Sequence, residues 1–192
     1  MQVAKPLLKG EIFIIRYADD FVIGFEYYAD AQRVMDTLPK RMAKFGLNIH
    51  PREIKLVDFS PDGKSKPPTI DFLGFTHYWT KSKKGAPVVK RRTSSKGLRK
   101  GIKKLEESCR NNRHKRLKEQ HKLLKAKLQG LCQYYSIRSN FKALQTFCQI
   151  ALKRWYYWLN KRSQTNSYTW VGYKILLQHF ILPLPRIIHN NV

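Results

Sequence analysis

Two adjacent carboxylates, Asp19 and Asp20, are the residues of this sequence whose types and spacing best suit chemistry. An apolar run, EIFIIR at 11–16, precedes them, and a second, FVIGF at 21–25, follows. Two such runs around a short turn predict a β-hairpin. The turn would project both carboxylates out of the sheet, where magnesium finds oxygen ligands. Two such ions, about 3.5–4 Å apart, can activate an attacking 3′-hydroxyl and stabilise a leaving pyrophosphate.

The competing interpretation is that Asp-Asp is only a turn, because aspartate caps and bends backbone readily. The context favours the catalytic interpretation, since an amphipathic helix follows the predicted hairpin. Pro39 lies inside this helix and predicts a kink or a shortening, and Gly46 predicts its end. The apolar residues at helical spacing are Ala31, Val34, Met35, Leu38, Met42 and Phe45.

Beyond this helix the pattern predicts two strands, 54–59 and 70–78, with a loop at 60–68 between them. The chain then turns strongly basic and helical. Helices are predicted from about 96 to 110, along a stripe from Leu117 to Tyr135, along a stripe from Phe141 to Trp158, and from about 170 to 180. Such stripes are typical of the core of a helical bundle.

The 192 residues carry a formal net charge of +25, from 38 basic against 13 acidic residues. This excess favours a polyanionic partner, because each basic side chain set against a phosphate releases counterions. A hydrophobic fraction of 42% excludes a disordered tail. No apolar run approaches the length of a membrane span, so nucleic acid is favoured over a membrane. The three cysteines lack C-x-x-C spacing and predict reduced core thiols, not a zinc site.

The run Tyr17-Ala18-Asp19-Asp20, followed by Phe21-Val22-Ile23, resembles the YADD motif of group II intron reverse transcriptases. Further stretches resemble this family in the same order along almost the whole chain, and their number and order make the resemblance specific. They are Gly46-Leu47 with His50-Pro51, the run DFLGFTH at 71–77, Lys83-Lys84-Gly85 with Lys90-Arg91, Gly130 with Tyr134-Tyr135, Trp155 and Trp158-Leu159 with Arg162-Ser163-Gln164, and Pro185-Arg186-Ile187 with His189.

The resemblance implies a role for each matched residue. Asp19 would bind Mg²⁺ with Asp20 as a less direct partner, and Tyr17 and Ala18 would line the primer and nucleotide side. Leu73 and Gly74 would hold the primer 3′ end, although an ordinary core strand with a bulge also explains this stretch. Nucleic-acid binding is implied for basic residues of the connection and the first thumb helix: Lys83, Lys84, Lys90, Arg91, Arg92, Lys100, Lys103 and Lys104. The competing interpretation of each is a solvated helix face.

We therefore expect an α+β fold, with a partial reverse-transcriptase palm of hairpin, helix and strands followed by an α-helical thumb bundle. The expected domains are the palm at 1–80, a basic linker at 81–95 and a maturase-specific thumb at 96–192. The family's fingers and another metal-binding aspartate lie upstream of the hairpin, so the chain alone is expected to be inactive.

The implied function is RNA-directed DNA synthesis coupled to intron splicing and mobility. Its partners would be group II intron RNA and an RNA/DNA primer–template, with no membrane, in the bacterial cytoplasm or an organellar matrix. Two alternatives stay open. The chain could be a non-catalytic RNA-binding maturase that assists splicing through its thumb, or a non-functional remnant.

Overall fold

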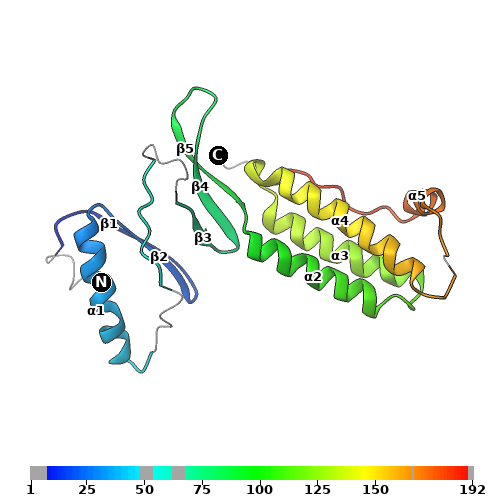
Figure 1. The fold of residues 1–192 in the computed structure, drawn as a ribbon, viewed down its shortest axis with the longest axis horizontal. Helices are drawn as coiled ribbons and strands as arrows, with labels where there is room; N and C mark the ends of the chain where they lie inside the picture. Colours follow the sequence, from blue (N-terminus) through cyan, green and yellow to red (C-terminus); the bar gives the residue numbers. More distant parts are fainter. Residues whose placement is uncertain (1–7, 48–53, 62–67, 166, 190–192) are drawn as a thin grey trace. The chain divides into compact units, whose positions relative to one another are not determined.

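The computed structural model describes residues 8–47, 54–61, 68–165 and 167–189 (Figure 1). The chain divides into a first unit, residues 1–73 and 77–89, and a helical unit, residues 74–76 and 90–192. In chain order the elements are β1 (Ile12–Tyr17), β2 (Asp20–Phe25), α1 (Tyr28–Ala43), β3 (Ile70–Phe72), β4 (Phe75–Lys81), β5 (Pro87–Thr93), α2 (Ser95–Asn111), α3 (Leu117–Tyr135), the 3₁₀ turn η2 (Arg138–Asn140), α4 (Phe141–Asn160) and α5 (Trp170–His179). The predicted α+β class is confirmed.

The predicted β-hairpin is present as β1 and β2, which pair antiparallel from Ile12 opposite Phe25 to Tyr17 opposite Asp20. The register leaves Ala18 and Asp19 as a two-residue turn. Because side chains alternate along a strand, one face of β1 carries Phe13, Ile15 and Tyr17. The carboxylate pair therefore lies at the end of a ladder in which every residue of β1 has a partner.

Helix α1 contacts β2 and ends at Ala43, close to the end that Gly46 predicted. Gly46 has a φ of +70°, which suits a helix terminus. The helix continues four residues beyond Pro39, so the predicted shortening at this proline is wrong. Asp30, only 2% exposed, accepts hydrogen bonds from the backbone N–H groups of Lys9 and Gly10, which ties the chain before β1 to the helix.

The strand predicted at 54–59 is wrong, because residues 54–61 form no ladder in the structure. Alternating apolar residues specify a strand only when a neighbouring edge accepts their backbone hydrogen bonds. Here the segment is held through a side chain instead. Trp79 Nε1 donates to the Phe59 carbonyl at 3.3 Å, and the two rings lie 5.6 Å apart. His50-Pro51 lies outside the described residues.

The stretch 70–78, predicted as one strand, forms two, β3 and β4, joined by a turn at Leu73 and Gly74. Both turn residues have positive φ, +49° and +76°, as in the tight turn that best suits twisted hairpins. The sheet continues in the order β3-β4-β5. Strand β5 occupies part of the stretch predicted as a basic linker.

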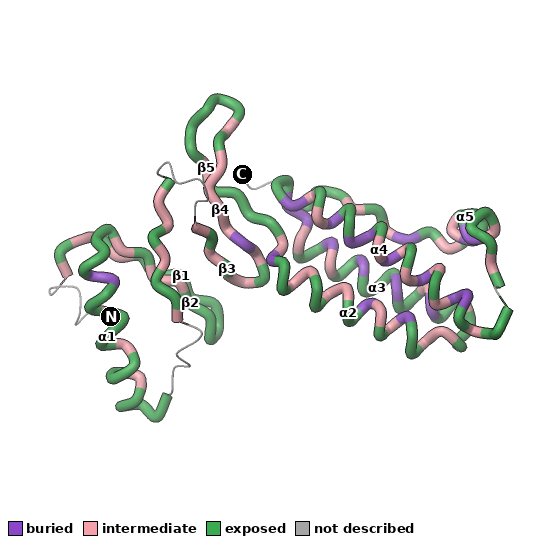
Figure 2. The backbone as a smooth tube through the Cα atoms, viewed as in Figure 1, coloured by how far each residue is buried: buried purple, intermediate pink, exposed green. Residues whose placement is uncertain are grey.

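Helices α2, α3, α4 and α5 agree with the predicted ranges within two residues at each end. Their buried faces meet in a single apolar cluster, and Figure 2 shows buried positions running along α2, α3 and α4. Its innermost members include Leu128, Leu144, Trp155, Leu159 and Tyr173. No helix in the described part of the chain is long and apolar enough to cross a membrane.

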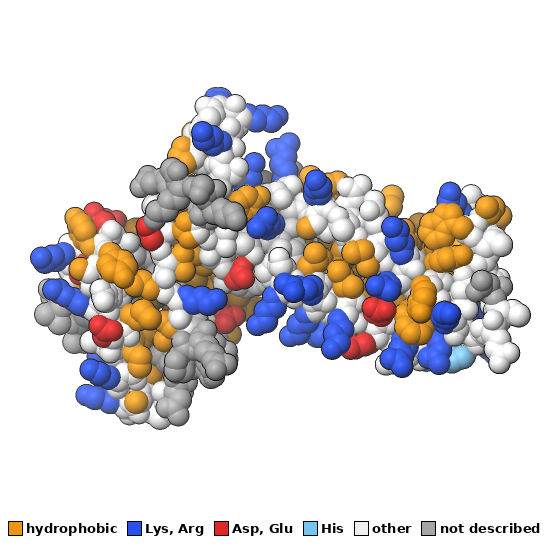
Figure 3. All heavy atoms as spheres, viewed as in Figure 1, with side chains coloured by type: hydrophobic (Ala, Val, Ile, Leu, Met, Phe, Trp, Pro, Cys, Tyr) orange, Lys and Arg blue, Asp and Glu red, His pale blue; other side chains and the backbone are white. Residues whose placement is uncertain are grey.

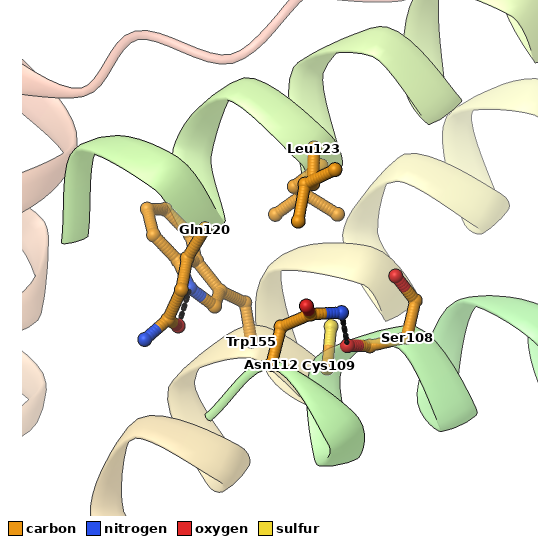
Figure 4. Close-up of a pocket in the computed structure, with 7 residues that line it drawn as sticks. Ser108, Cys109, Asn112, Gln120, Leu123 and Trp155 are labelled. Carbon is orange, nitrogen blue, oxygen red and sulfur yellow. Dashed lines mark hydrogen bonds between the residues drawn. The ribbon is translucent and has the colours of Figure 1, made fainter. Parts of the chain in front are cut away.

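The largest side chain of this core also forms a buried hydrogen bond. Trp155 Nε1 donates to Gln120 Oε1 at 3.1 Å, and Gln120 Nε2 in turn donates to two backbone carbonyls, so this buried amide is satisfied. Ser108, Cys109 and Leu123 lie beside the pair and line a small hollow (Figure 4). Because the amide and the indole are already paired within the protein, we interpret this hollow as part of the core.

The C-terminal segment lies along the helical unit. His121 Nε2 lies 2.9 Å from the carbonyl oxygen of Ile181. The Ser136 carbonyl accepts from the backbone N–H groups of Ile188 and His189, at 3.2 and 3.0 Å. His189 thus sits at the turn between α3 and α4.

Candidate active site and nucleic-acid interface

The tip of the β1–β2 hairpin is strained. Ala18 has a φ of +50°, a conformation that glycine adopts freely and that costs other residues of order 1–3 kcal/mol. The side chain of Arg16 donates through Nε to the Ala18 carbonyl at 2.9 Å and so helps to hold the turn. The tip therefore depends on its neighbours for a conformation that alanine disfavours.

Asp19 and Asp20 are both exposed, one in the turn and one at the start of β2. Tyr17 pairs with Asp20, so the tyrosine and this carboxylate share a face of the sheet. No cluster of three or more His, Cys, Asp or Glu residues occurs in the described ranges. Magnesium takes one or two carboxylates and completes its shell with water and phosphate, so this pair fits one ion held jointly with a phosphate.

The face that carries Tyr17 is apolar and open. Phe13, Ile15 and Tyr17 are 65%, 62% and 66% exposed, which is unusual for three neighbouring positions on one strand face. Leu73, by contrast, is half-buried in its turn. Of the residues expected on the primer side, Ala18, Leu73 and Gly74 thus lie in two tight turns, and Tyr17 is the last residue of the strand before the first turn.

The region that contains both turns is similar to a known family. Residues 1–77 match the reverse transcriptase (RNA-dependent DNA polymerase) family. This reverse-transcriptase-like region includes the hairpin, α1, β3, the Leu73–Gly74 turn and the first residues of β4. The match thus supports kinship with RNA-directed DNA polymerases for the part of the chain that carries Asp19 and Asp20. No curated protein matches the chain.

Backbone strain is concentrated in this reverse-transcriptase-like region. Among the described residues, Ala18 and Leu73 are the two non-glycine residues with positive φ. Both are residues that the sequence motifs assign to the primer side. Conformations of this kind persist only where the surroundings over-determine them, and they are common at functional sites.

The basic residues predicted to bind nucleic acid are all exposed. Lys83 and Lys84 lie within the turn between β4 and β5, which the hydrogen bond from the Gly85 N–H to the Ser82 carbonyl closes, and Lys90, Arg91 and Arg92 lie on β5. Lys100, Lys103 and Lys104 lie on α2, and Figure 3 shows Lys and Arg side chains gathered over the helices of this unit. Leu98, Ile102, Leu105 and Cys109 occupy the apolar face of α2. The lysines therefore point away from the bundle core.

Asn140, for which the sequence predicted no role, and Tyr135, which it predicted on the core stripe of its helix, organise the start of the helical unit. Asn140, 1% exposed, accepts from the Thr93 backbone N–H at 2.7 Å and donates to Thr93 Oγ1 and to the Tyr135 carbonyl. Tyr135 contacts Gly74 and Phe75. An asparagine just before a helix is a recognisable cap-type signal, but its partner 47 residues away is not.

The cysteines lie in the core of the helical unit. Burial raises the pKa of the Cys109 thiol to about 11 and that of Cys148 to about 12. Burial also raises the pKa of Cys132, which lies within hydrogen-bonding reach of Cys148. A thiol with a raised pKa is a poor nucleophile and a poor metal ligand near neutral pH. These cysteines are therefore core residues in character.

Proposed function

We propose that this chain contributes the catalytic hairpin and the thumb of a group II intron reverse transcriptase/maturase, which couples RNA-directed DNA synthesis to intron splicing and mobility. The observation that best supports the proposal is the position of backbone strain. Ala18 and Leu73, the strained residues, lie in the region similar to reverse transcriptases, and Ala18 is followed directly by Asp19 and Asp20. A turn with only a structural role would more readily place glycine or asparagine at a positive φ than alanine or leucine.

At the hairpin tip, Asp19 and Asp20 would hold magnesium together with a substrate phosphate. When bound, magnesium supplies positive charge that stabilises the attacking and leaving oxygens of phosphoryl transfer. The protein's own contribution is to present two exposed carboxylates on a fixed turn. Tyr17 and Ala18 would line the primer and nucleotide beside them.

The Leu73–Gly74 turn would hold the 3′ end of the primer. A glycine in such a turn lets backbone approach a nucleic-acid strand closely. Gly74 is exposed in the structure, so a strand can reach it. This is the role that the resemblance implies for the turn, and the strain at Leu73 supports it.

The helical unit would bind a duplex with A-form character through its basic surface. The exposed lysines of α2, Lys100, Lys103 and Lys104, fall on one side of the helix, opposite its apolar face. Such a row suits the phosphates of a duplex, which are read by shape and charge more than by sequence. The choice of intron RNA as partner rests on the motifs beyond residue 77, especially Tyr134-Tyr135 and Arg162-Ser163-Gln164.

The metal role can be tested with Mn²⁺ as a paramagnetic substitute for Mg²⁺. In the full chain, Mn²⁺ should broaden the amide NMR signals of residues 17–21, because the ion would be held close to their backbone. The double variant Asp19→Asn/Asp20→Asn should lose the broadening. Asp36→Asn, which changes an exposed carboxylate on α1, is the matched control and should keep it. Equal broadening in both variants would contradict the proposal.

A non-catalytic maturase that binds RNA through the helical unit is a second candidate. The observation that favours it is the absence of a third carboxylate near Asp19 and Asp20 within the described residues. The two candidates differ in one outcome. Both expect RNA binding by the helical unit, but only the first expects Mn²⁺ at the hairpin tip.

A further inference from the structure

The backbone of Gly74 is fastened to the start of α2. The Gly74 carbonyl accepts a hydrogen bond from the Ser94 backbone N–H at 2.9 Å. Ser94, 5% exposed, is also the N-cap of α2, and its Oγ accepts from the Gly97 N–H at 3.1 Å. One buried serine therefore joins the turn to the first turn of a helix.

The hydroxyl of Tyr135 fills the space beside this connection. A Cβ at Gly74 would lie 2.7 Å from Tyr135 Oη, closer than real Cβ atoms come to any neighbour. A Cβ at Gly97 would lie 3.5 Å from the same hydroxyl and 3.6 Å from the Gly74 carbonyl oxygen. The tyrosine thus occupies the room that two glycines leave open.

Tyr135 is itself held from several sides. Its ring lies 5.0 Å from that of Phe75, which directly follows Gly74, and Phe75 also stacks on Tyr134 at 5.7 Å. Its backbone carbonyl accepts from Asn140 Nδ2 at 3.0 Å. Burial raises the pKa of the Tyr135 hydroxyl, so it stays neutral against the glycine backbone.

We infer that Tyr135 is a positioning residue for the Leu73–Gly74 turn. Leu73 at a φ of +49° needs outside support, and the Gly74 side of the turn has it in Ser94 and Tyr135. The inference rests on the proposed function in that the turn is taken to hold the primer 3′ end. Tyr135 then acts on the primer through the turn and makes no contact with the reacting atoms.

The contact itself can be tested by a double-mutant cycle read by thermal melting of the full chain. Gly85→Ala is the matched control for Gly74→Ala, because Gly85 has a similar φ of +83° but nothing within 4 Å of where its Cβ would lie. Gly74→Ala should lower the melting temperature more than Gly85→Ala. In a Tyr135→Phe background, which lacks the hydroxyl, the loss from Gly74→Ala should shrink toward that of Gly85→Ala. An unchanged loss would overturn the inference.

The positioning role needs a readout that overall stability does not move. A DNA primer with a 3′-terminal 4-thiothymidine, annealed to an RNA template, is crosslinked to the full chain, and the adduct is mapped by mass spectrometry. Tyr135→Ala should lower the crosslink yield at residues 73 and 74 about fivefold, while Tyr135→Phe, which keeps the ring, restores most of it. Helix content and duplex affinity should stay within about twofold of the parent protein, because many lysines share the phosphate contacts.

Tyr157→Ala, which removes an exposed tyrosine of α4, is the control and should leave the yield unchanged. Equal yields in the parent protein and Tyr135→Ala would overturn the positioning role. Absence of any crosslink at the turn in the parent protein would instead refute the proposed primer contact, and with it the role of Tyr135 in primer placement. In that case the melting cycle still reports whether Tyr135 supports the turn.

Discussion

The β1–β2 hairpin and the helical bundle use apolar side chains in opposite ways. On β1, Phe13, Ile15 and Tyr17 are each more than 60% exposed, whereas Trp155 and Leu159 of α4 are 1% and 0% exposed. The bundle closes on itself because its amphipathic helices bury their stripes against one another. The hairpin is different: among the described elements, α1 packs against it, and a single helix can cover only one face of its two strands. Apolar content alone therefore does not tell whether a segment can stabilise itself.

The strongest test of this contrast separates the two regions. A fragment from Lys96 to Val192 should be soluble, helical and cooperatively melting, and residues 1–80 should precipitate or stay unfolded, because open apolar strands invite aggregation. A fragment that begins at Lys90 should melt higher than one that begins at Lys96, since it keeps the bond of Thr93 to Asn140 and the Ser94 N-cap of α2. Circular dichroism melts decide both points. A stable, β-rich, monomeric 1–80 fragment would remove the contrast.

Single substitutions in the bundle and on the hairpin should show the same difference in their effect on the free energy of unfolding. Trp155→Ala should lower the free energy of unfolding by about 3–5 kcal/mol, because it empties a packed site and leaves Gln120 Oε1 without its donor. Ile15→Ala, on the exposed face, should cost within about 0.5 kcal/mol. Urea unfolding followed by circular dichroism measures both. Similar costs at the two positions would show that the hairpin face is covered in solution.

Asn140 tests how the helical unit is tied to the end of β5. Asn140→Ala should cost about 1–3 kcal/mol, because it leaves the Thr93 N–H without its partner and removes one of the two donors to the Tyr135 carbonyl, the other being the Ile137 N–H. Asn140→Asp restores the acceptor for Thr93 but not the donor, so it should recover only part of the loss. Gln145→Ala, which changes an exposed side chain of α4, is the matched control and should be neutral in the same urea titration. A neutral Asn140→Ala would mean that the network contributes nothing.

Charge reversal on α2 tests whether the basic surface is an interface or only a solvated face. Lys103→Glu/Lys104→Glu should weaken binding to many RNA sequences alike and reduce the slope of log K against log salt by about one per lost phosphate contact. Lys153→Glu, which changes an exposed lysine of α4, is the control and should have a smaller effect. Fluorescence anisotropy at several salt concentrations measures this. An affinity independent of salt would refute the assignment.

The pH dependence of stability should report the buried thiols. Burial raises the pKa of Cys109 from 9.0 to about 11, so above pH 9 the unfolded chain loses this proton before the folded protein does. Stability should therefore fall as pH rises from about 9 to about 11, by at most about 1.4 kcal/mol per pH unit for each such thiol. Cys109→Ala should flatten the slope of melting temperature against pH. An unchanged slope would show that Cys109 is not the group responsible.

Local sequence patterns were sufficient to predict an element when its hydrogen bonds are made within it or with the segment next to it in the sequence. The stripe from Leu117 to Tyr135 predicted α3 at its full length, because a helix needs only its own backbone and one apolar face. The YADD hairpin was also predicted, since its two strands are neighbours in sequence. The strand at 54–59 failed for the opposite reason. A strand needs a partner edge, and alternation of side chains cannot say whether one is present.

The sequence by itself determined the order and type of most elements and placed two carboxylates at a turn. Only the tertiary structure decided which residues support the Leu73–Gly74 turn. The sequence allowed Leu73-Gly74 to be a bulge, and only the folded chain shows that Ser94 and Tyr135 meet Gly74 there. The physical reason is the distance along the sequence over which each kind of interaction acts. Propensity and periodicity act over a few residues, whereas the contact of Tyr135 with Gly74 spans 61 positions and exists only after the bundle has closed.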